Sequence, residues 1–413
     1  KCGLLMGFMK YNRFLFLIPV LFMILSIMSI QTSYAEINST TRVIVGVYTT
    51  RFNTYVTVLT RYGSIVSTIP EIGAVILEIP VDKIPVVKTL WFAKYVEPDY
   101  VVTIHQEVRW NIQMIYAPNV WYTYDDYVGD AAYGYYPYLH VAVVDTGIYY
   151  SHTDLQGAVV YCIVSLNNGA IFYKGTNLRN CNDPNGHGTH VAGIIAARLN
   201  GVGVAGVAPK VRLYAVRVLS ASGSGYISDI ARGIVESTKG PDGVAGTSDD
   251  ADVISMSLGG PHSDTLYNAV KYAYSYGVVL VAAAGNEGAD SPSYPAAYPE
   301  VIAVGAIDIN YNVPSWSNRN SDLVAPGVNI LSTYKNNLYA YMSGTSMACP
   351  HVSGVVALMQ AIRQAFGLRK LTPDEVKYIL VNTAIDLGSS GYDPLYGYGL
   401  VDAEYAVYVA INW

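Results

Sequence analysis

The chain has 413 residues, of which 52% are hydrophobic and 14% are charged, and it carries a formal net charge of -6 at pH 7. A chain of this length and apolar content exceeds one ordinary domain and can bury a large core, which excludes intrinsic disorder. The acidic balance and the lack of a cluster of Lys and Arg argue against nucleic acid as a partner, since phosphate binding depends on such clusters.

The first 35 residues have the pattern of an export signal. Lys10 and Arg13 precede an apolar run at residues 14–30, and the segment ends in Ser33-Tyr34-Ala35. We expect cleavage after Ala35, which predicts a secreted, extracellular protein. The alternative is an uncleaved anchor that keeps the protein at the cell surface, because the run approaches the roughly 20 residues that span a bilayer.

Residues 36–105 predict a small α+β domain without a catalytic motif. Short apolar runs separated by turn residues are typical of strands, and one candidate helix contains Pro85. The expected strands cover residues 42–49, 63–69, 72–80 and 93–102, and the expected helix covers residues 81–92.

Residues 106–413 alternate between strand-like and helix-like segments. This pattern predicts an α/β domain with a mostly parallel sheet that helices cover on both faces. The strand-like segments are apolar throughout, as expected for strands buried on both sides, and they cover residues 140–145, 211–219, 252–258, 277–285 and 301–307. The helical patterns cover residues 187–199, 228–238, 264–277 and 346–366.

Three separated segments supply an acid, a base and a nucleophile in the order Asp145, His187 and Ser346. Asp145 closes a buried strand pattern, so its carboxylate should emerge at the carboxyl end of that strand. His187 and Ser346 each precede a helical pattern, and the unpaired N–H groups at the amino end of a helix favour an anion nearby. Each residue alone is a common feature of a turn or a helix cap. Together they indicate nucleophilic acyl transfer.

With Asn286 in the segment AAAGNEG, these motifs resemble those of the subtilisin-like serine proteases. The resemblance covers nearly all of residues 106–413 and implies a three-layer α/β fold. It implies that Ser346 attacks the peptide carbonyl, that His187 transfers the proton and that Asp145 orients the imidazole. Asn286 would donate a hydrogen bond to the oxyanion. The implied function is a serine endopeptidase that acts on proteins and peptides.

Residues 36–105 resemble the small ferredoxin-like propeptide of secreted subtilisins, most closely at residues 95–99. The resemblance implies that this domain assists folding, that it then inhibits the enzyme as an intramolecular partner, and that self-cleavage near His105 and Gln106 matures the precursor. An unrelated amino-terminal domain is the alternative. We expect the mature enzyme to be a monomer.

The resemblance also implies a substrate cleft between two edges of backbone. Extended peptides would pair with one edge by main-chain hydrogen bonds, and small residues would leave room for a bulky apolar side chain before the scissile bond. The pocket floor would lie in residues 287–295, so we expect a broad endopeptidase with apolar or aromatic preference. The implied substrate-binding residues are Ser257, Leu258 and Gly259 on one edge, Gly223, Ser224 and Gly225 on the other, and Ala283, Ala284 and Gly285 in the pocket wall.

A structural calcium ion is the cofactor that the resemblance implies, and no organic cofactor is expected. The matching family positions are Asp154 with its carboxylate, Asn200 with its side-chain oxygen, and the carbonyls of Arg198, Val202 and Val204. A second candidate is the acidic insertion with Asp242, Asp249, Asp250 and Asp252, which resembles a longer calcium-binding insertion of some archaeal, thermophilic members. Its alternative is a solvated acidic loop.

Cys162 and Cys181 flank a loop that resembles an insertion before His187. Export permits disulfides, so we expect these two residues to be joined. Cys349, which follows Ser346 closely, is expected to be a free thiol buried in a core helix.

Two other functions remain to be compared. A catalytically inactive binding module would lack one of the four implied catalytic residues, but all four are present. An esterase of the α/β-hydrolase type would carry a Gly-x-Ser-x-Gly elbow, whereas the context of Ser346 is GTSMA.

Overall fold

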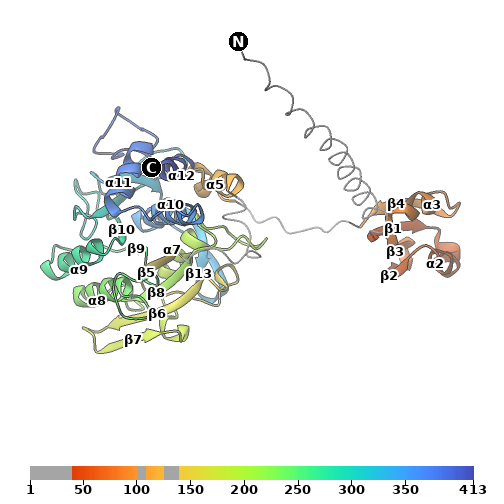
Figure 1. Ribbon diagram of the computed structural model, residues 1–413, viewed down its shortest axis with the longest axis horizontal. Coiled ribbons are helices and arrows are strands. Elements are labelled where there is room, and N and C mark those ends of the chain that lie inside the picture. Colours follow the sequence, from red (N-terminus) through yellow and green to blue (C-terminus); the bar gives the residue numbers. More distant parts are fainter. Residues whose placement is uncertain (1–39, 100–107, 125–138) are drawn as a thin grey trace, which may run out of the picture. The chain divides into compact units, whose positions relative to one another are not determined.

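The computed structural model describes residues 40–99, 108–124 and 139–413, and the chain divides into two compact units, residues 1–103 and 104–413 (Figure 1). The division falls next to the boundary predicted after residue 105. The expected signal segment at residues 1–35 and the expected cleavage near His105 and Gln106 lie outside the described residues.

In the first unit, four strands form an antiparallel sheet in the order β2-β3-β1-β4. With one helix after β1 and one after β3, this is the ferredoxin-like arrangement. Pro85 lies in the first turn of α3, where a missing backbone N–H is tolerated. The elements are β1 (Thr40–Val47), α2 (Phe52–Leu59), β2 (Ser64–Ile69), β3 (Ala74–Pro80), α3 (Ile84–Lys88) and β4 (Ala93–Pro98).

Helix α2 is an element that the sequence pattern does not predict. Thr and Val, which favour strands, fill half of its positions. However, Phe52, Tyr55 and Leu59 lie on one helical face and are buried in the core of this unit, where the ring of Tyr55 stacks on Phe92 with centroids 4.6 Å apart. Burial of this face therefore outweighs local propensity.

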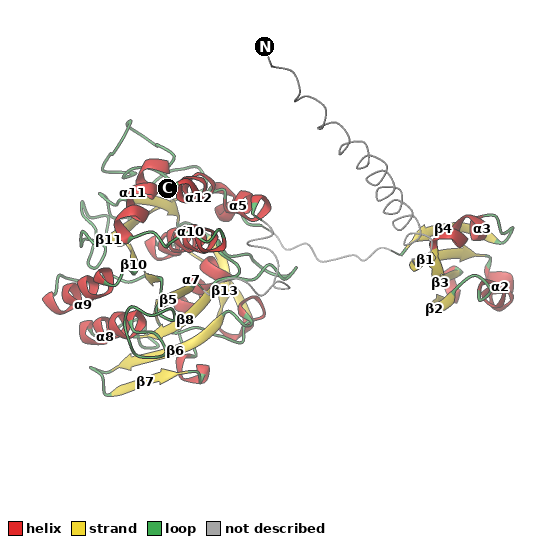
Figure 2. Ribbon diagram, in the orientation of Figure 1, coloured by secondary structure: helices red, strands yellow, loops and turns green. Residues whose placement is uncertain are grey.

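The second unit contains an eight-stranded sheet in the order β12-β11-β10-β9-β5-β8-β6-β7 (Figure 2). All neighbouring strands are parallel except β6 and β7, which form an antiparallel hairpin at one edge, so the predicted mostly parallel sheet is confirmed. The strands are β5 (His140–Asp145), β6 (Val159–Leu166), β7 (Ile171–Gly175), β8 (Arg212–Arg217), β9 (Val253–Met256), β10 (Val279–Ala283), β11 (Val301–Ile307) and β12 (Leu323–Pro326).

Helices cover both faces of this sheet, and alternate residues of its strands enter two different cores. In β5, Val141 and Val143 pack in the core that includes residues of α7 and α10, whereas Ala142 and Val144 pack in the core that includes residues of α8 and α9. This two-sided burial explains why the strands are apolar throughout. The helices are α7 (His187–Ala196), α8 (Ile227–Thr238), α9 (Asp264–Ser275), α10 (Thr345–Ala365), α11 (Pro373–Thr383) and α12 (Ala403–Asn412).

Smaller elements complete the second unit. They are α4 (Trp110–Met114), α5 (Ala117–Thr123) and the antiparallel hairpin of β13 (Ile330–Tyr334) and β14 (Leu338–Met342). The backbone N–H of Ala403, the first residue of α12, donates to the carbonyl of Ile115 at 2.9 Å, so the amino-terminal helices of the unit are tied to its carboxyl-terminal helix.

Helix α10 runs through the larger core. Among the described residues, it is the helix that is long and apolar enough to cross a membrane by composition, and 89% of its most apolar window is buried in the protein. Cys349, in its second turn, is free and fully buried, and burial raises the pKa of its thiol to about 11. This thiol therefore stays protonated at neutral pH.

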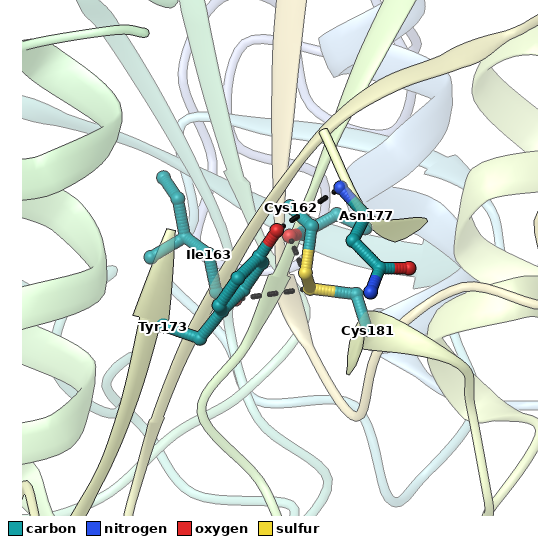
Figure 3. Close-up of a disulfide and its surroundings, with 6 residues drawn as sticks. Cys162, Ile163, Tyr173, Asn177 and Cys181 are labelled. Atoms are coloured by element: carbon teal, nitrogen blue, oxygen red, sulfur yellow. Dashed lines mark hydrogen bonds between the residues drawn. A yellow bond between two sulfur atoms is a disulfide. The ribbon is translucent and has the colours of Figure 1, made fainter. Parts of the chain in front are cut away.

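A disulfide joins Cys162 in β6 to Cys181 at the end of a short 3-10 helix, Leu178–Cys181 (Figure 3). Both cysteines are buried, and the loop that they enclose contains β7. Within this loop the backbone N–H of Asn177 donates to the Tyr173 hydroxyl at 3.0 Å. The disulfide therefore holds the hairpin of β6 and β7 against the segment that leads to His187.

Candidate active site

The sheet of the second unit has a switch point between β5 and β9. From this point β8 and β6 extend the sheet in one direction, and β10, β11 and β12 extend it in the other. Ligands of open parallel sheets bind outside the carboxyl ends of the strands at such a point. Asp145 is the last residue of β5, and Ser257 follows β9, so both lie at this edge.

Asp145 and His187 form a hydrogen-bonded pair there. Nδ1 of His187 lies 2.9 Å from each carboxylate oxygen of the fully buried Asp145. The backbone N–H of Thr146 donates to Oδ1 of the same carboxylate at 2.7 Å. Because Nδ1 donates to the carboxylate, Nε2 is the ring nitrogen left to accept a proton.

The electrostatic surroundings of His187 favour its protonated form. Burial lowers the pKa of the imidazole, but the charge of Asp145, the hydrogen bond to it and the charge of Asp183 outweigh burial. The pKa therefore lies above its ordinary value of 6.5. Such a ring is a stronger base than free imidazole.

Ser346 lies in the first turn of α10, beside the segment that follows β9. Its hydroxyl donates to the carbonyl of Ser257 at 3.3 Å, and the Ser257 hydroxyl donates to the carbonyl of Ser346 at 2.8 Å. This reciprocal pair fixes the expected substrate edge next to the expected nucleophile. The hydroxyl proton of Ser346 must turn away from Ser257 before it can be donated to another acceptor.

Asn286 is held by the residue that precedes Ser346. Its side-chain oxygen accepts from the backbone N–H of Thr345 at 2.8 Å and from the Thr345 hydroxyl at 3.0 Å. With the oxygen engaged in this way, the amide NH2 group is free to donate elsewhere. The sequence analysis did not identify Thr345 as the residue that positions Asn286. Its place next to Ser346 in the sequence is the signal that could have identified it.

The two expected substrate edges differ in their surroundings. Beyond Leu258 and Gly259, Gly260 forms an antiparallel bridge with Tyr294, with N–H···O distances of 2.8 and 3.1 Å. The opposite segment with Gly223, Ser224 and Gly225 is exposed, and the side chain of Asn185 donates to the carbonyl of Ala221, just before this segment, at 2.9 Å. One edge is thus fixed by the fold, and the other is an exposed loop next to the start of α7.

A carboxylate from the expected pocket floor, Glu287, lies beside the expected pocket wall. Ala283 and Ala284 are buried, and a Cβ at Gly285 would overlap Nδ2 of Asn318 and lie 2.6 Å from Oε2 of Glu287. The Asn318 amide donates to that Glu287 oxygen at 2.9 Å. Gly285 is therefore required for space, and a negative charge lies beside the wall of small residues.

The structure brings Asp154 together with the loop at residues 198–204. The Asp154 carboxylate is fully buried and accepts from the Val204 backbone N–H at 2.8 Å, from the Tyr339 hydroxyl at 2.9 Å and from the Asn200 amide at 3.3 Å. The Arg198 backbone N–H donates to the Asp154 carbonyl at 2.7 Å. Every one of these donors is neutral, so no cationic side chain in this set offsets the charge of the buried carboxylate, a role that a calcium ion would fill. The side-chain oxygen of Asn200, an expected ligand, accepts from the Val202 N–H at 3.1 Å.

In the acidic insertion, the described residues contain one group of three carboxylates. Oxygens of Asp242, Asp249 and Asp250 lie within 4.8 Å of one another. The prediction that Asp252 belongs to this group is wrong, because its carboxylate accepts from the His140 backbone N–H at 2.8 Å and forms an ion pair with Lys370. Asp252 immediately precedes β9, so its side chain lies at the amino edge of the sheet, where it pairs with Lys370.

Comparison with known proteins yields matches over most of this unit. The profile of the subtilase family matches residues 139–399. The chain is 45% identical over 273 residues to subtilisin DY of Bacillus licheniformis, which covers 64% of this chain and 89% of that protein. It is 47% identical over 269 residues to subtilisin Savinase of Lederbergia lenta, with coverages of 64% and 89%. It is 44% identical over 316 residues to an alkaline protease of Alkalihalobacillus alcalophilus, with coverages of 76% and 73%.

The matched range includes Asp145, His187, Asn286 and Ser346. It also includes all the strands of the parallel sheet. The similarity to archaeal and thermophilic members, which the acidic insertion suggested, stays a prediction. The family profile covers more than half of the chain, and the relatives are 44 to 47% identical over most of their own length. The chain therefore belongs to the subtilase family of subtilisin-like serine proteases, and it is a serine endopeptidase.

Proposed function

We propose that Asp145, His187 and Ser346 form the catalytic triad of this endopeptidase. The observation that carries the proposal is the 2.9 Å hydrogen bond between Asp145 and His187 at the carboxyl edge of the sheet. The contact between Ser346 and Ser257 supports it, since it brings the nucleophile to the same switch point. Asn286 acts as the oxyanion donor through its free amide NH2 group.

The reaction begins when the Ser346 hydroxyl turns toward Nε2 of His187. Its oxygen bonds to the peptide carbonyl carbon, its proton moves to Nε2, and the carbonyl electron pair moves onto the oxygen, which Asn286 stabilises. His187 then gives the proton to the leaving amine as the C–N bond breaks, which leaves an acyl-enzyme. In the second half, a water oxygen bonds to the acyl carbon while its proton moves to the same nitrogen. The bond between the acyl carbon and the Ser346 oxygen then breaks, the proton returns to that oxygen, and the acid product leaves.

Extended peptides bind along Ser257, Leu258 and Gly259 by main-chain pairing, with the exposed segment at Gly223 to Gly225 on the other side. Ala283, Ala284 and Gly285 then line the space for the side chain before the scissile bond. Their small size favours bulky apolar or aromatic residues in that place. Glu287, which accepts a hydrogen bond from Asn318, places a charge near this space. This charge weakens the preference for apolar side chains, so the specificity is broad.

The first unit acts as a propeptide of a secreted precursor. Its support is a ferredoxin-like fold with a hydrophobic core of its own, and a unit boundary next to the expected cleavage near His105 and Gln106. We expect this unit to assist folding of the second unit, to inhibit it as an intramolecular partner and to be removed by self-cleavage. The mature enzyme is then a secreted monomer.

The pH profile of casein hydrolysis tests the role of His187. Because His187 must be neutral to act as a base and its pKa is raised, activity should be lost as pH falls and should rise through a midpoint above about 6.5. The measurement is kcat/KM of the mature protein between pH 5 and 10, with a short-chain ester as comparison substrate. Maximal activity in acid, or hydrolysis of the ester without casein, would contradict the proposal.

A calcium ion at Asp154 stabilises the second unit without taking part in the reaction. Asp154 and Asn200 would supply side-chain oxygens, and Arg198, Val202 and Val204 would supply carbonyls. None of these groups belongs to the triad, so the ion acts by binding the folded state. Such binding adds about 2.7 kcal/mol of stability at a hundredfold excess over Kd.

Removal of calcium should therefore lower the thermal midpoint by several degrees, with kcat unchanged well below that midpoint. The measurement is the midpoint with calcium and with excess chelator. In Asp154→Asn the difference between the two conditions should largely vanish, whereas Asp264→Asn, whose side chain is 94% exposed, should keep it. Equal midpoints for the unaltered protein in both conditions would show that the site binds no calcium.

A further inference from the structure

A second buried carboxylate lies beside the Asp145–His187 pair. Asp183 is only 2% exposed and accepts five hydrogen bonds, all from neutral donors. Its Oδ1 accepts from the Thr146 hydroxyl at 2.8 Å and from the backbone N–H groups of Asn185 and Gly186 at 2.9 Å each. Its Oδ2 accepts from the backbone N–H of Thr189 at 2.9 Å and from the Thr189 hydroxyl at 2.6 Å.

These hydrogen bonds connect the strand that carries the acid to the helix that carries the base. Thr146 donates its backbone N–H to Asp145 at 2.7 Å and its hydroxyl to Asp183, while the same hydroxyl accepts from the Gly188 N–H at 3.0 Å. Asp183 in turn binds residues on both sides of His187. The relative position of β5 and the first turn of α7 therefore depends on one buried carboxylate.

The charge of Asp183 also acts on His187. Among the described residues, the carboxylates whose charges raise the pKa of His187 are Asp145 and Asp183. His190 is buried, and burial lowers its pKa to about 4, so it is neutral. Other titratable groups lie near the segment of Asp183. They are Arg217 at the end of β8, which the charge of Asp183 also affects, Tyr334, whose hydroxyl donates to the Asn185 carbonyl at 3.0 Å, and Lys335, whose Nζ donates to the Pro184 carbonyl at 2.8 Å.

We propose that Asp183 is a positioning residue of the triad, which holds His187 against Asp145 and whose charge stabilises the imidazolium that forms during acylation. The inference rests on the proposed role of His187 as the base. The charge of Asp183 raises the pKa of the imidazole together with the charge of Asp145. Because Asp183 is only 2% exposed, it acts on the ring without touching the substrate.

The test compares Asp183→Asn with two variants of Thr146. Asp183→Asn keeps the size of the side chain and removes its charge, so the acid limb of kcat/KM should move to lower pH by about 0.3 to 1 unit. On the alkaline plateau kcat should fall about two- to tenfold, with KM nearly unchanged. Thr146→Val, which breaks the link but keeps the charge, should lower kcat without moving the acid limb, and Thr146→Ser should restore the rate.

Activity is normalised to active-site concentration, and thermal midpoints are recorded so that unfolded protein is not counted. Asp264→Asn, which removes an exposed charge, should leave the acid limb in place. An unmoved acid limb in Asp183→Asn, with an active unaltered enzyme, would overturn the role of Asp183 alone. An unaltered enzyme whose activity shows no acid limb would overturn the role of His187, and this inference with it.

Discussion

Replacement of Ser346 by alanine should abolish peptide hydrolysis and leave the precursor uncleaved. Without the hydroxyl no acyl-enzyme forms, and the only remaining catalysis comes from the oxyanion donor and substrate binding. The expected fall in kcat is about 10^6-fold, the size of the loss seen when the nucleophile of subtilisin is removed. The same variant should accumulate as the full precursor after signal removal, because maturation is proposed to be self-cleavage.

The measurement is casein hydrolysis together with intact mass of the purified protein. Ser275→Ala is the matched control, because this serine is exposed at the end of α9 and makes one local hydrogen bond to the Tyr272 carbonyl. It should mature and cleave casein normally. If purified Ser346→Ala processed itself without added protease, both the nucleophile assignment and the self-cleavage proposal would fail.

Replacement of Asp145 by asparagine should lower kcat about 10^4-fold, the loss that the corresponding change causes in another Ser-His-Asp protease. The hydrogen bonds explain the direction. The Thr146 N–H donates to Oδ1 at 2.7 Å, so the amide oxygen of the new side chain takes that position and its NH2 group faces Nδ1 of His187. Nδ1 must then accept, and the proton moves to Nε2, where it blocks proton transfer from Ser346.

The experiment measures kcat and KM for a peptide substrate, with Asp264→Asn as the control for loss of a surface carboxylate. KM should change little, because Asp145 is fully buried and does not reach the substrate. Recovery of part of the activity at high pH would fit the tautomer argument. Retention of more than about a tenth of the activity at neutral pH would refute the assigned role of Asp145.

Much of the fold of the second unit could be predicted from local signals. The segments predicted as strands at residues 140–145 and 301–307 match β5 and β11, because strands buried on both faces are apolar throughout. Helix α10 begins one residue before the predicted start at Ser346. In contrast, the Thr and Val residues of α2 gave no helical signal. Its helix forms because Phe52 and Tyr55 are buried in the core of the first unit, which includes residues far along the sequence.

The candidate site also contains some residues that the sequence identifies and others that it does not. Asp145, His187, Asn286 and Ser346 stand out in the sequence because each lies in a short motif with Gly or small residues around it. The residues that hold them in place cannot be found in this way. Thr345 and Asp183 lie in no distinctive motif, and their roles depend on the residues that they contact in the fold. The pairing of Asp252 with Lys370 joins residues separated by 118 positions, so no local pattern predicts it.

The sequence alone therefore determined the family, the parallel sheet and the identity of the candidate catalytic residues, because motifs and apolar periodicity are properties of neighbouring residues. Only the tertiary structure decided which carboxylates act together. When α7 packs beside β5, Asp145 meets the imidazole of His187, and Asp183 accepts hydrogen bonds from residues on both sides of that histidine. Asp252 instead forms an ion pair with Lys370, which is distant in the sequence. The physical reason is that the energy of a buried charge depends on the partners that the fold brings within hydrogen-bond distance.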